Sequence, residues 1–197
     1  MQNVVSQVDS AFLYIIGFSF ALLLGITAAM IYFLFRYRKD RNPVPADIRS
    51  NARLELVWTA VPTLIALSMF YVGWQSFIGL RGVPKDAMDV GVTGMQWTWV
   101  FTYPNGKRSE SLMEVPLGKP VKLTIRSLDV IHGFYSPAFR IKMDALPNMN
   151  TYAWFYAARQ GDYVVFCSQY CGEGHAEMSA TIRVVPENEY LQWLRKK

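Results

Sequence analysis

The 197-residue sequence contains few thiols and imidazoles, with only two cysteines and two histidines. Two cysteines are too few for the disulfide framework that holds small secreted domains together. The sequence also lacks internal repeats and low-complexity segments. Its net charge is +5, but the basic residues form no patch interleaved with aromatic residues, which argues against nucleic-acid binding. The length allows one medium-sized domain plus something smaller.

Charged residues are absent from two apolar blocks in the first 80 residues. The blocks cover residues 11–35 and 56–80, and each is 25 residues long. We predict that they form transmembrane helices at about 11–36 and 56–80, because about 20 apolar residues span a bilayer. Pro62 lies in the second block, where neighbouring helices can accommodate a kink or an early break. A signal peptide is the alternative for the first block, but it has no basic start and no small-residue cleavage site.

A short loop between the blocks holds six of the 20 lysines and arginines. They are Arg36, Arg38, Lys39, Arg41, Arg49 and Arg53. The positive-inside rule places this loop in the cytoplasm, so the N-terminus and everything after residue 80 lie on the outer side. The predicted domains are therefore a helical hairpin over 1–80 and an outer domain over 81–197. Glu55 stands at the cytoplasmic mouth of the second helix, as an interfacial carboxylate or the start of a proton path, and position alone favours the first.

From residue 81 onwards the pattern changes to short strands and turns. Residues 121–127, VKLTIRS, alternate apolar and polar side chains, which is the period of a half-buried strand. Similar runs lie at 95–103, 151–157, 162–168 and 179–185, with Gly, Pro and Asn turns between them. Strands at this spacing predict an antiparallel β-sandwich of about 100 residues. Within residues 81–197, only residues 187–197 are predicted to form a helix.

Both cysteines, one histidine and a methionine fall within residues 167–178. They are spaced C-x3-C-x3-H-x2-M, as Cys167, Cys171, His175 and Met178, in the loop after the 162–168 strand. Thiolates, imidazole and a thioether favour copper, and a single copper ion in such a site uses one thiolate. Two thiolates therefore indicate two copper ions that share bridging sulfurs. The two histidines would then bind one metal each, with His132 brought in by folding, and Met178 and a loop carbonyl would be weak ligands.

Three other sites are compatible with the same cysteines. A disulfide is chemically possible in an oxidising compartment, but it does not explain why both histidines accompany it. A Cys2His2 zinc site usually contains C-x2-C pairs and does not require the methionine. A thioredoxin-like copper carrier needs alternating helices and strands, which residues 81–197 do not show. The dinuclear copper site accounts for all of these side chains.

With these residues the sequence resembles cytochrome c oxidase subunit II over nearly its whole length. The resemblance implies a two-helix transmembrane hairpin followed by an all-β, cupredoxin-like Greek-key sandwich that carries the dinuclear copper A centre. It also implies the ligand set, in which the carbonyl comes from the residue two after the first cysteine. The implied ligands are His132, Cys167, the backbone carbonyl of Gln169, Cys171, His175 and Met178.

Two further roles follow from the resemblance alone. Residues 94–103 resemble the tryptophan-rich region of the family, in which the first Trp of W-x-W, here Trp97, is where electrons enter. Glu55, in an E-x-x-W pattern with Trp58, matches a glutamate at the mouth of a proton channel. The resemblance therefore favours a proton path for Glu55, whereas its position alone favours a simple interfacial carboxylate.

Many members of the family have Glu at the position of Gln169, and the side chain of that Glu helps hold magnesium at the border with subunit I. An amide is a poorer ligand for a hard cation, which counts against magnesium here.

The resemblance implies an electron-input subunit of a proton-translocating respiratory oxidase. Cytochrome c would give electrons one at a time to the copper centre, and haem in subunit I would receive them and reduce oxygen to water. The expected partners are subunits I and III, cytochrome c and membrane lipid. The expected location is a bacterial inner membrane with the copper domain on the periplasmic side, with the mitochondrial inner membrane as the alternative. A membrane-anchored copper chaperone or store is the alternative function, whereas quinol oxidase subunits typically lack the cysteines and histidines.

The charge of the outer domain departs from the family pattern. Residues 81–197 contain 14 Lys and Arg against 11 Asp and Glu. Members that dock a basic cytochrome c usually present an acidic face. The sequence leaves three explanations open: the acidic residues cluster locally, the donor docks through apolar contacts, or the donor is itself acidic.

Overall fold

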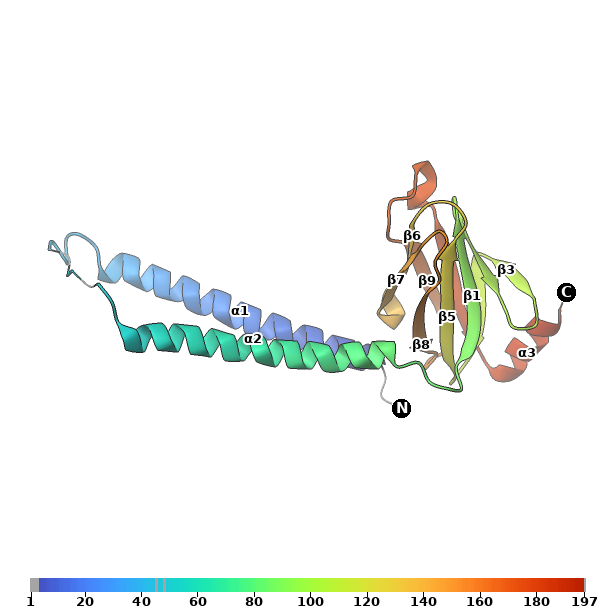
Figure 1. Ribbon diagram of the computed structural model, residues 1–197, viewed down its shortest axis with the longest axis horizontal. Coiled ribbons are helices and arrows are strands. Elements are labelled where there is room, and N and C mark those ends of the chain that lie inside the picture. Colours follow the sequence, from blue (N-terminus) through green and yellow to red (C-terminus); the bar gives the residue numbers. More distant parts are fainter. Residues whose placement is uncertain (1–3, 45, 48, 197) are drawn as a thin grey trace. The chain divides into compact units, whose positions relative to one another are not determined.

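The computed structural model describes residues 4–44, 46–47 and 49–196, and the chain divides into two compact units (Figure 1). One unit comprises residues 8–77, and the other holds the remaining described residues. The first contains most of two long helices, and the second contains the strands.

The helices α1 (Val4–Arg36) and α2 (Ala52–Arg81) form a hairpin whose large apolar side chains are mostly exposed. The hydroxyl of Tyr14 on α1 donates a hydrogen bond to Ser68 Oγ on α2, 2.9 Å away. Both helices are long and apolar enough to cross a membrane, which confirms the prediction. They begin at Val4 and Ala52, earlier than expected, because polar residues outside a bilayer can extend a helix. Helix α2 also continues through Pro62, so the early break considered there does not occur.

Asn51 and Glu55 fix the start of α2. The side-chain carbonyl of Asn51 accepts a hydrogen bond from the backbone N–H of Leu54 at 3.1 Å. In return, Glu55 Oε1 accepts the backbone N–H of Asn51 at 3.4 Å. This reciprocal arrangement resembles a capping box and satisfies N–H groups that a helix start leaves without partners.

The second unit is a sandwich of two five-stranded sheets, with strand orders β3-β2-β1-β5-β8 and β4-β10-β9-β6-β7 (Figure 1). The strands are β1 (Met88–Met95), β2 (Thr98–Thr102), β3 (Arg108–Glu110), β4 (Leu112–Pro116), β5 (Pro120–Ser127), β6 (His132–Ser136), β7 (Ile141–Ala145), β8 (Thr151–Tyr156), β9 (Gly161–Cys167) and β10 (Ser179–Val185). Two 3-10 helices, η1 (Pro137–Phe139) and η2 (Glu173–Ala176), and the C-terminal helix α3 (Glu187–Arg195) complete it. The predicted all-β sandwich and terminal helix are confirmed.

The sandwich is mixed rather than purely antiparallel, which corrects one expectation. Strand β1 pairs in parallel with β5, and β4 pairs in parallel with β10. Both pairs join strands that are distant in the chain, and between them the chain visits the other sheet, at β4 for the first pair and at β5 and β8 for the second. A second correction concerns residues 95–103, predicted as one strand: the chain turns at Gln96 and Trp97 between β1 and β2, which pair antiparallel.

The core lies between the sheets and extends to the end that carries both cysteines. Its largest fully buried side chains come from both sheets and include Trp99, Phe101 and Phe134. Cys167, Cys171 and Met178 belong to the same buried cluster. The sulfur atoms are therefore held by close-packed neighbours, which fixes their positions more firmly than an exposed loop could.

Candidate metal centre

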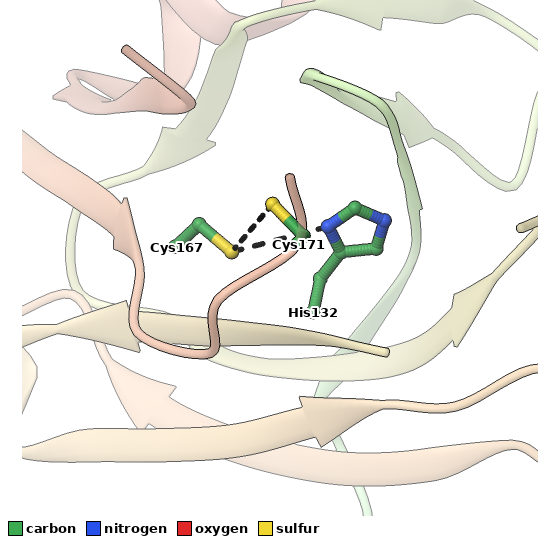
Figure 2. Close-up of side chains that lie close together, drawn as sticks. All are labelled: His132, Cys167 and Cys171. Atoms are coloured by element: carbon green, nitrogen blue, oxygen red, sulfur yellow. Dashed lines mark hydrogen bonds between the residues drawn. The ribbon is translucent and has the colours of Figure 1, made fainter. Parts of the chain in front are cut away.

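The two thiols lie close together at the end of β9. Cys167 is the last residue of that strand, and Cys171 follows in the loop that leads to η2. Their Sγ atoms are 3.8 Å apart, both side chains are buried, and both thiols are free (Figure 2). A disulfide needs about 2.05 Å between the sulfurs. The pair is therefore unbonded and close enough to share a metal ion.

His132 is brought to this pair as the first residue of β6. Its Nδ1 atom is 3.9 Å from Cys167 Sγ, and the side chain is completely buried. The ligand atoms of His132, Cys167 and Cys171 all lie within 4.8 Å of one another. Figure 2 shows the imidazole beside the two sulfurs, although the chain separates it from Cys167 by 35 residues. The register explains this placement, since β6 and β9 are antiparallel neighbours with Phe134 opposite Cys167.

Asp129 holds the other side of the His132 imidazole. Its Oδ1 atom lies 2.8 Å from His132 Nε2 and also accepts the N–H of Val130, while Oδ2 accepts the N–H of Gln96 at 2.7 Å. Burial alone raises the pKa of Asp129, but these hydrogen bonds outweigh it and hold the pKa below its usual range. An ionised carboxylate at Nε2 keeps the proton on that nitrogen. Nδ1 is then free to bind a metal, as in other carboxylate–histidine–metal arrangements.

The remaining predicted ligands lie around the same sulfurs. His175 Nδ1 is 3.6 Å from Cys171 Sγ, and Met178 Sδ is 3.8 Å from that sulfur. The backbone carbonyl of Gln169 is 3.2 Å from Cys167 Sγ. The structure thus brings together all six ligand atoms that the sequence predicts. The Gln169 residue is otherwise exposed.

The protonation of the Cys171 thiol follows from its burial. Burial raises the pKa of Cys171 to about 11, with further contributions from the hydrogen bond and the charge of Cys167. The metal-free thiol is therefore protonated at neutral pH, and a metal must displace that proton to bind. The donor set of thiolates, imidazoles, a thioether and one carbonyl fits copper and does not fit magnesium or calcium.

Trp97 lies directly against the ligand loop. A methyl group at Gly174 would come within 2.6 Å of Cδ2 of the indole, and one at Gly172 within 3.3 Å of its Nε1 atom. The indole therefore packs on the backbone between Cys171 and His175, while 42% of the Trp97 surface stays exposed. This places Trp97 between solvent and the candidate metal centre. Its role in electron uptake stays a prediction.

Glu55 is the one predicted site residue that is not gathered at the metal centre. It lies in the helical unit, at the start of α2, where its carboxylate accepts the Asn51 N–H. Conversely, Asp129 and Gln96 contact the ligand set, although the sequence did not single them out. The signal for Asp129 was its position three residues before His132, within the segment DVIH.

Four loops at the metal end of the sandwich carry carboxylates together with exposed apolar side chains. Hydrogen bonds join residues 94–98, 127–131, 146–150 and 168–178 to one another. These loops carry three carboxylates and no lysine or arginine, with Arg126 at their border. Their exposed large apolar side chains are Trp97, Leu128, Val130, Ile131, Met149 and Tyr170. Three of the eleven acidic residues of the outer domain therefore lie in loops that contain no basic residue, although the domain as a whole is basic.

Comparisons with known proteins cover both units. The family model "Cytochrome C oxidase subunit II, transmembrane domain" matches residues 1–77, and "Cytochrome C oxidase subunit II, periplasmic domain" matches residues 108–185. The alternative cytochrome c oxidase subunit 2 of Bradyrhizobium diazoefficiens is 32% identical over 93% of this chain and 76% of its own. Cytochrome c oxidase subunit 2 of Cereibacter sphaeroides is 29% identical over 89% and 71%.

Solved structures match the sandwich. The periplasmic domain of cytochrome oxidase subunit II of Bradyrhizobium japonicum is 37% identical, with a TM-score of 0.55 over 57% of this chain and 94% of that chain. A subunit II in a mixed disulfide intermediate with a thioredoxin-like protein is 35% identical, with a TM-score of 0.52 over 57% and 92%.

Proposed function

Because the chain belongs to the cytochrome c oxidase subunit II family, we propose that it is the electron-input subunit of a respiratory terminal oxidase. The observation that carries the proposal is the pair of buried thiols 3.8 Å apart, with the Nδ1 atom of one histidine beside each sulfur. These residues would hold copper, which would supply one-electron redox chemistry between cytochrome c and haem in subunit I, where oxygen would be reduced with proton pumping.

Two copper ions fit the donor set better than one. A single ion of this type uses one thiolate, two imidazoles and a weak axial ligand, which would leave the second buried thiol without a role. With two ions, Cys167 and Cys171 would supply a thiolate to both metals, and His132 and His175 would each hold one of them. The thioether of Met178 and the carbonyl of Gln169 then complete the set. Because the sulfur atoms lie in the packed core, the protein would hold them in nearly the same positions when an electron is gained or lost.

The donor in this proposal is a cytochrome c with a basic rim. The loops around Trp97 offer two exposed carboxylates, Glu173 and Glu177, beside exposed apolar side chains. Opposite charges would steer the encounter, and the apolar contacts would hold the complex. Transient oxidation of cytochromes c across a salt series tests this, because steering weakens steeply as ionic strength rises.

The remaining roles rest on the family. The two helices anchor the chain beside subunits I and III, in a bacterial inner membrane with the metal centre on the periplasmic side. Glu55 would stand at the mouth of a proton channel of the assembled oxidase. One relative forms a mixed disulfide with a thioredoxin-like protein. The same chemistry here would keep Cys167 and Cys171 reduced before copper binds.

The test is metal analysis and spectroscopy of the full chain in detergent after copper loading. We expect two copper ions per chain and a purple, mixed-valence spectrum in which one unpaired electron is shared by both metals. A colourless chain with one Cu(I) would contradict the proposal and fit the copper chaperone or store instead.

A further inference from the structure

Gln96 contacts both halves of the ligand set from the turn between β1 and β2. Its backbone N–H donates to Asp129 Oδ2, and its side-chain Nε2 donates to the backbone carbonyl of Cys171, both at 2.7 Å. The chain separates these two partners by 42 residues, and Gln96 lies 33 and 75 residues before them. One residue therefore ties the histidine side of the centre to the cysteine side.

On the histidine side, Gln96 fixes the plane of the Asp129 carboxylate. Oδ2 accepts the Gln96 N–H, while Oδ1 lies against His132 Nε2. A carboxylate held at both oxygens has little freedom to rotate. The imidazole that it orients therefore keeps Nδ1 directed at Cys167.

On the cysteine side, the Gln96 amide holds the peptide that joins Cys171 to Gly172. That peptide is part of the surface on which the Trp97 indole packs, because a methyl group at Gly172 would lie 3.1 Å from Gln96 Nε2 and 3.3 Å from Trp97 Cζ2. Gln96 and Trp97 are consecutive residues of one turn. The hydrogen bond to Cys171 therefore fixes the distance between this turn and the ligand loop.

We propose that Gln96 is a positioning residue for electron uptake, which holds the indole of Trp97 against the Cys171–His175 backbone and fixes the Cys171 peptide. The inference rests on the proposed function, since it concerns the same centre. Electron tunnelling weakens steeply as the gap between donor and acceptor widens. Loss of the amide contact would therefore slow electron uptake even when the centre retains its metal.

The test replaces Gln96 in the full chain, within the assembled oxidase. Gln96→Leu keeps the approximate size and removes the amide, and Gln96→Asn keeps the amide but is one methylene too short for the 2.7 Å contact. Gln160→Leu, at an exposed glutamine in the turn before β9, is the matched control. The measurements are copper content, the absorption and EPR spectra, chelator competition, and the transient rate of copper reduction by reduced cytochrome c.

We expect both Gln96 variants to bind two copper ions, to show a shifted EPR spectrum, and to lose about tenfold in the electron-uptake rate, the lower end of the effects seen for groups that orient metal ligands. Gln160→Leu should match the wild type in every measurement. A Gln96→Asn variant with wild-type spectrum and rate would overturn the inference. If the wild type itself lacked the two-copper spectrum, the proposed function would have failed instead.

Discussion

Replacing Asp129 by asparagine should weaken copper binding at His132 without removing any metal ligand. The carboxylate accepts hydrogen bonds at both oxygens, from His132 and Val130 at Oδ1 and from Gln96 at Oδ2. An amide has only one acceptor oxygen. If that oxygen faces His132, the NH2 group opposes the N–H of Gln96. If the amide is turned round, its NH2 group donates to Nε2, which favours the tautomer with the proton on Nδ1 and blocks the ligand nitrogen.

The size of the effect follows from what is lost in either orientation. A hydrogen bond to a charged group contributes about 1.5–3 kcal/mol. At about 1.4 kcal/mol per tenfold change, its loss corresponds to a decrease in copper affinity of about 10–100-fold. The same range is found when groups that orient metal-bound histidines are replaced.

Competition with a copper chelator measures this affinity on the full chain in detergent. Asp144→Asn is the matched control, because Asp144 is an exposed aspartate on β7 of the same unit. We expect the control to retain wild-type affinity and Asp129→Asn to lose copper at a much lower chelator concentration. Equal affinities for Asp129→Asn and the wild type would refute the view that this carboxylate sets the tautomer and orientation of His132.

Three other measurements test separate parts of the mechanism. The pKa of Cys171 is raised to about 11, so copper must displace a proton from this thiol at any lower pH, and the copper affinity should rise with pH. Titration with a pH-stat should detect the released protons, and pH-independent loading would show that the Cys171 thiol is already ionised. Trp97→Phe should slow electron uptake while the copper content stays unchanged, and wild-type transfer kinetics would remove Trp97 from the path. Glu55→Gln should reduce the proton-coupled turnover of the assembled oxidase and leave the copper spectrum intact. Normal turnover would leave Glu55 only its contact with Asn51 at the start of α2.

The side chains that lie together at the candidate metal centre could be predicted from the sequence because their chemistry is unusual. Two thiols, an imidazole and a thioether within residues 167–178 have few alternative explanations, and the resemblance to the family supplied the carbonyl of Gln169. The two membrane helices could also be predicted, because a run of 25 uncharged residues is typical of a helix that spans a bilayer and rare in other structures. Strands with alternating side chains, such as β5 and β10, were also predicted correctly.

The parts that the sequence did not show are those that depend on long-range packing. Strand β4 is buried at four of its five positions, so it has no alternating pattern to detect. The turn at Gln96 and Trp97 contains no glycine or proline, so the sequence pattern predicts an unbroken strand there. The contacts of Gln96 reach residues 33 and 75 positions away, and local periodicity carries no information about such distances.

The position of His132 on β6 and of Cys167 on the neighbouring β9 has a kinetic consequence. A metal held by both residues cross-links two strands at the end of the core, and the donor atoms of His132 and Cys167 are buried. A chelator can reach such a metal only after the 168–178 loop separates from β6, which is a local unfolding event. The rate of copper release should therefore become independent of chelator concentration once the chelator is in excess. Under those conditions, metal exchange measures how often this end of the sandwich opens.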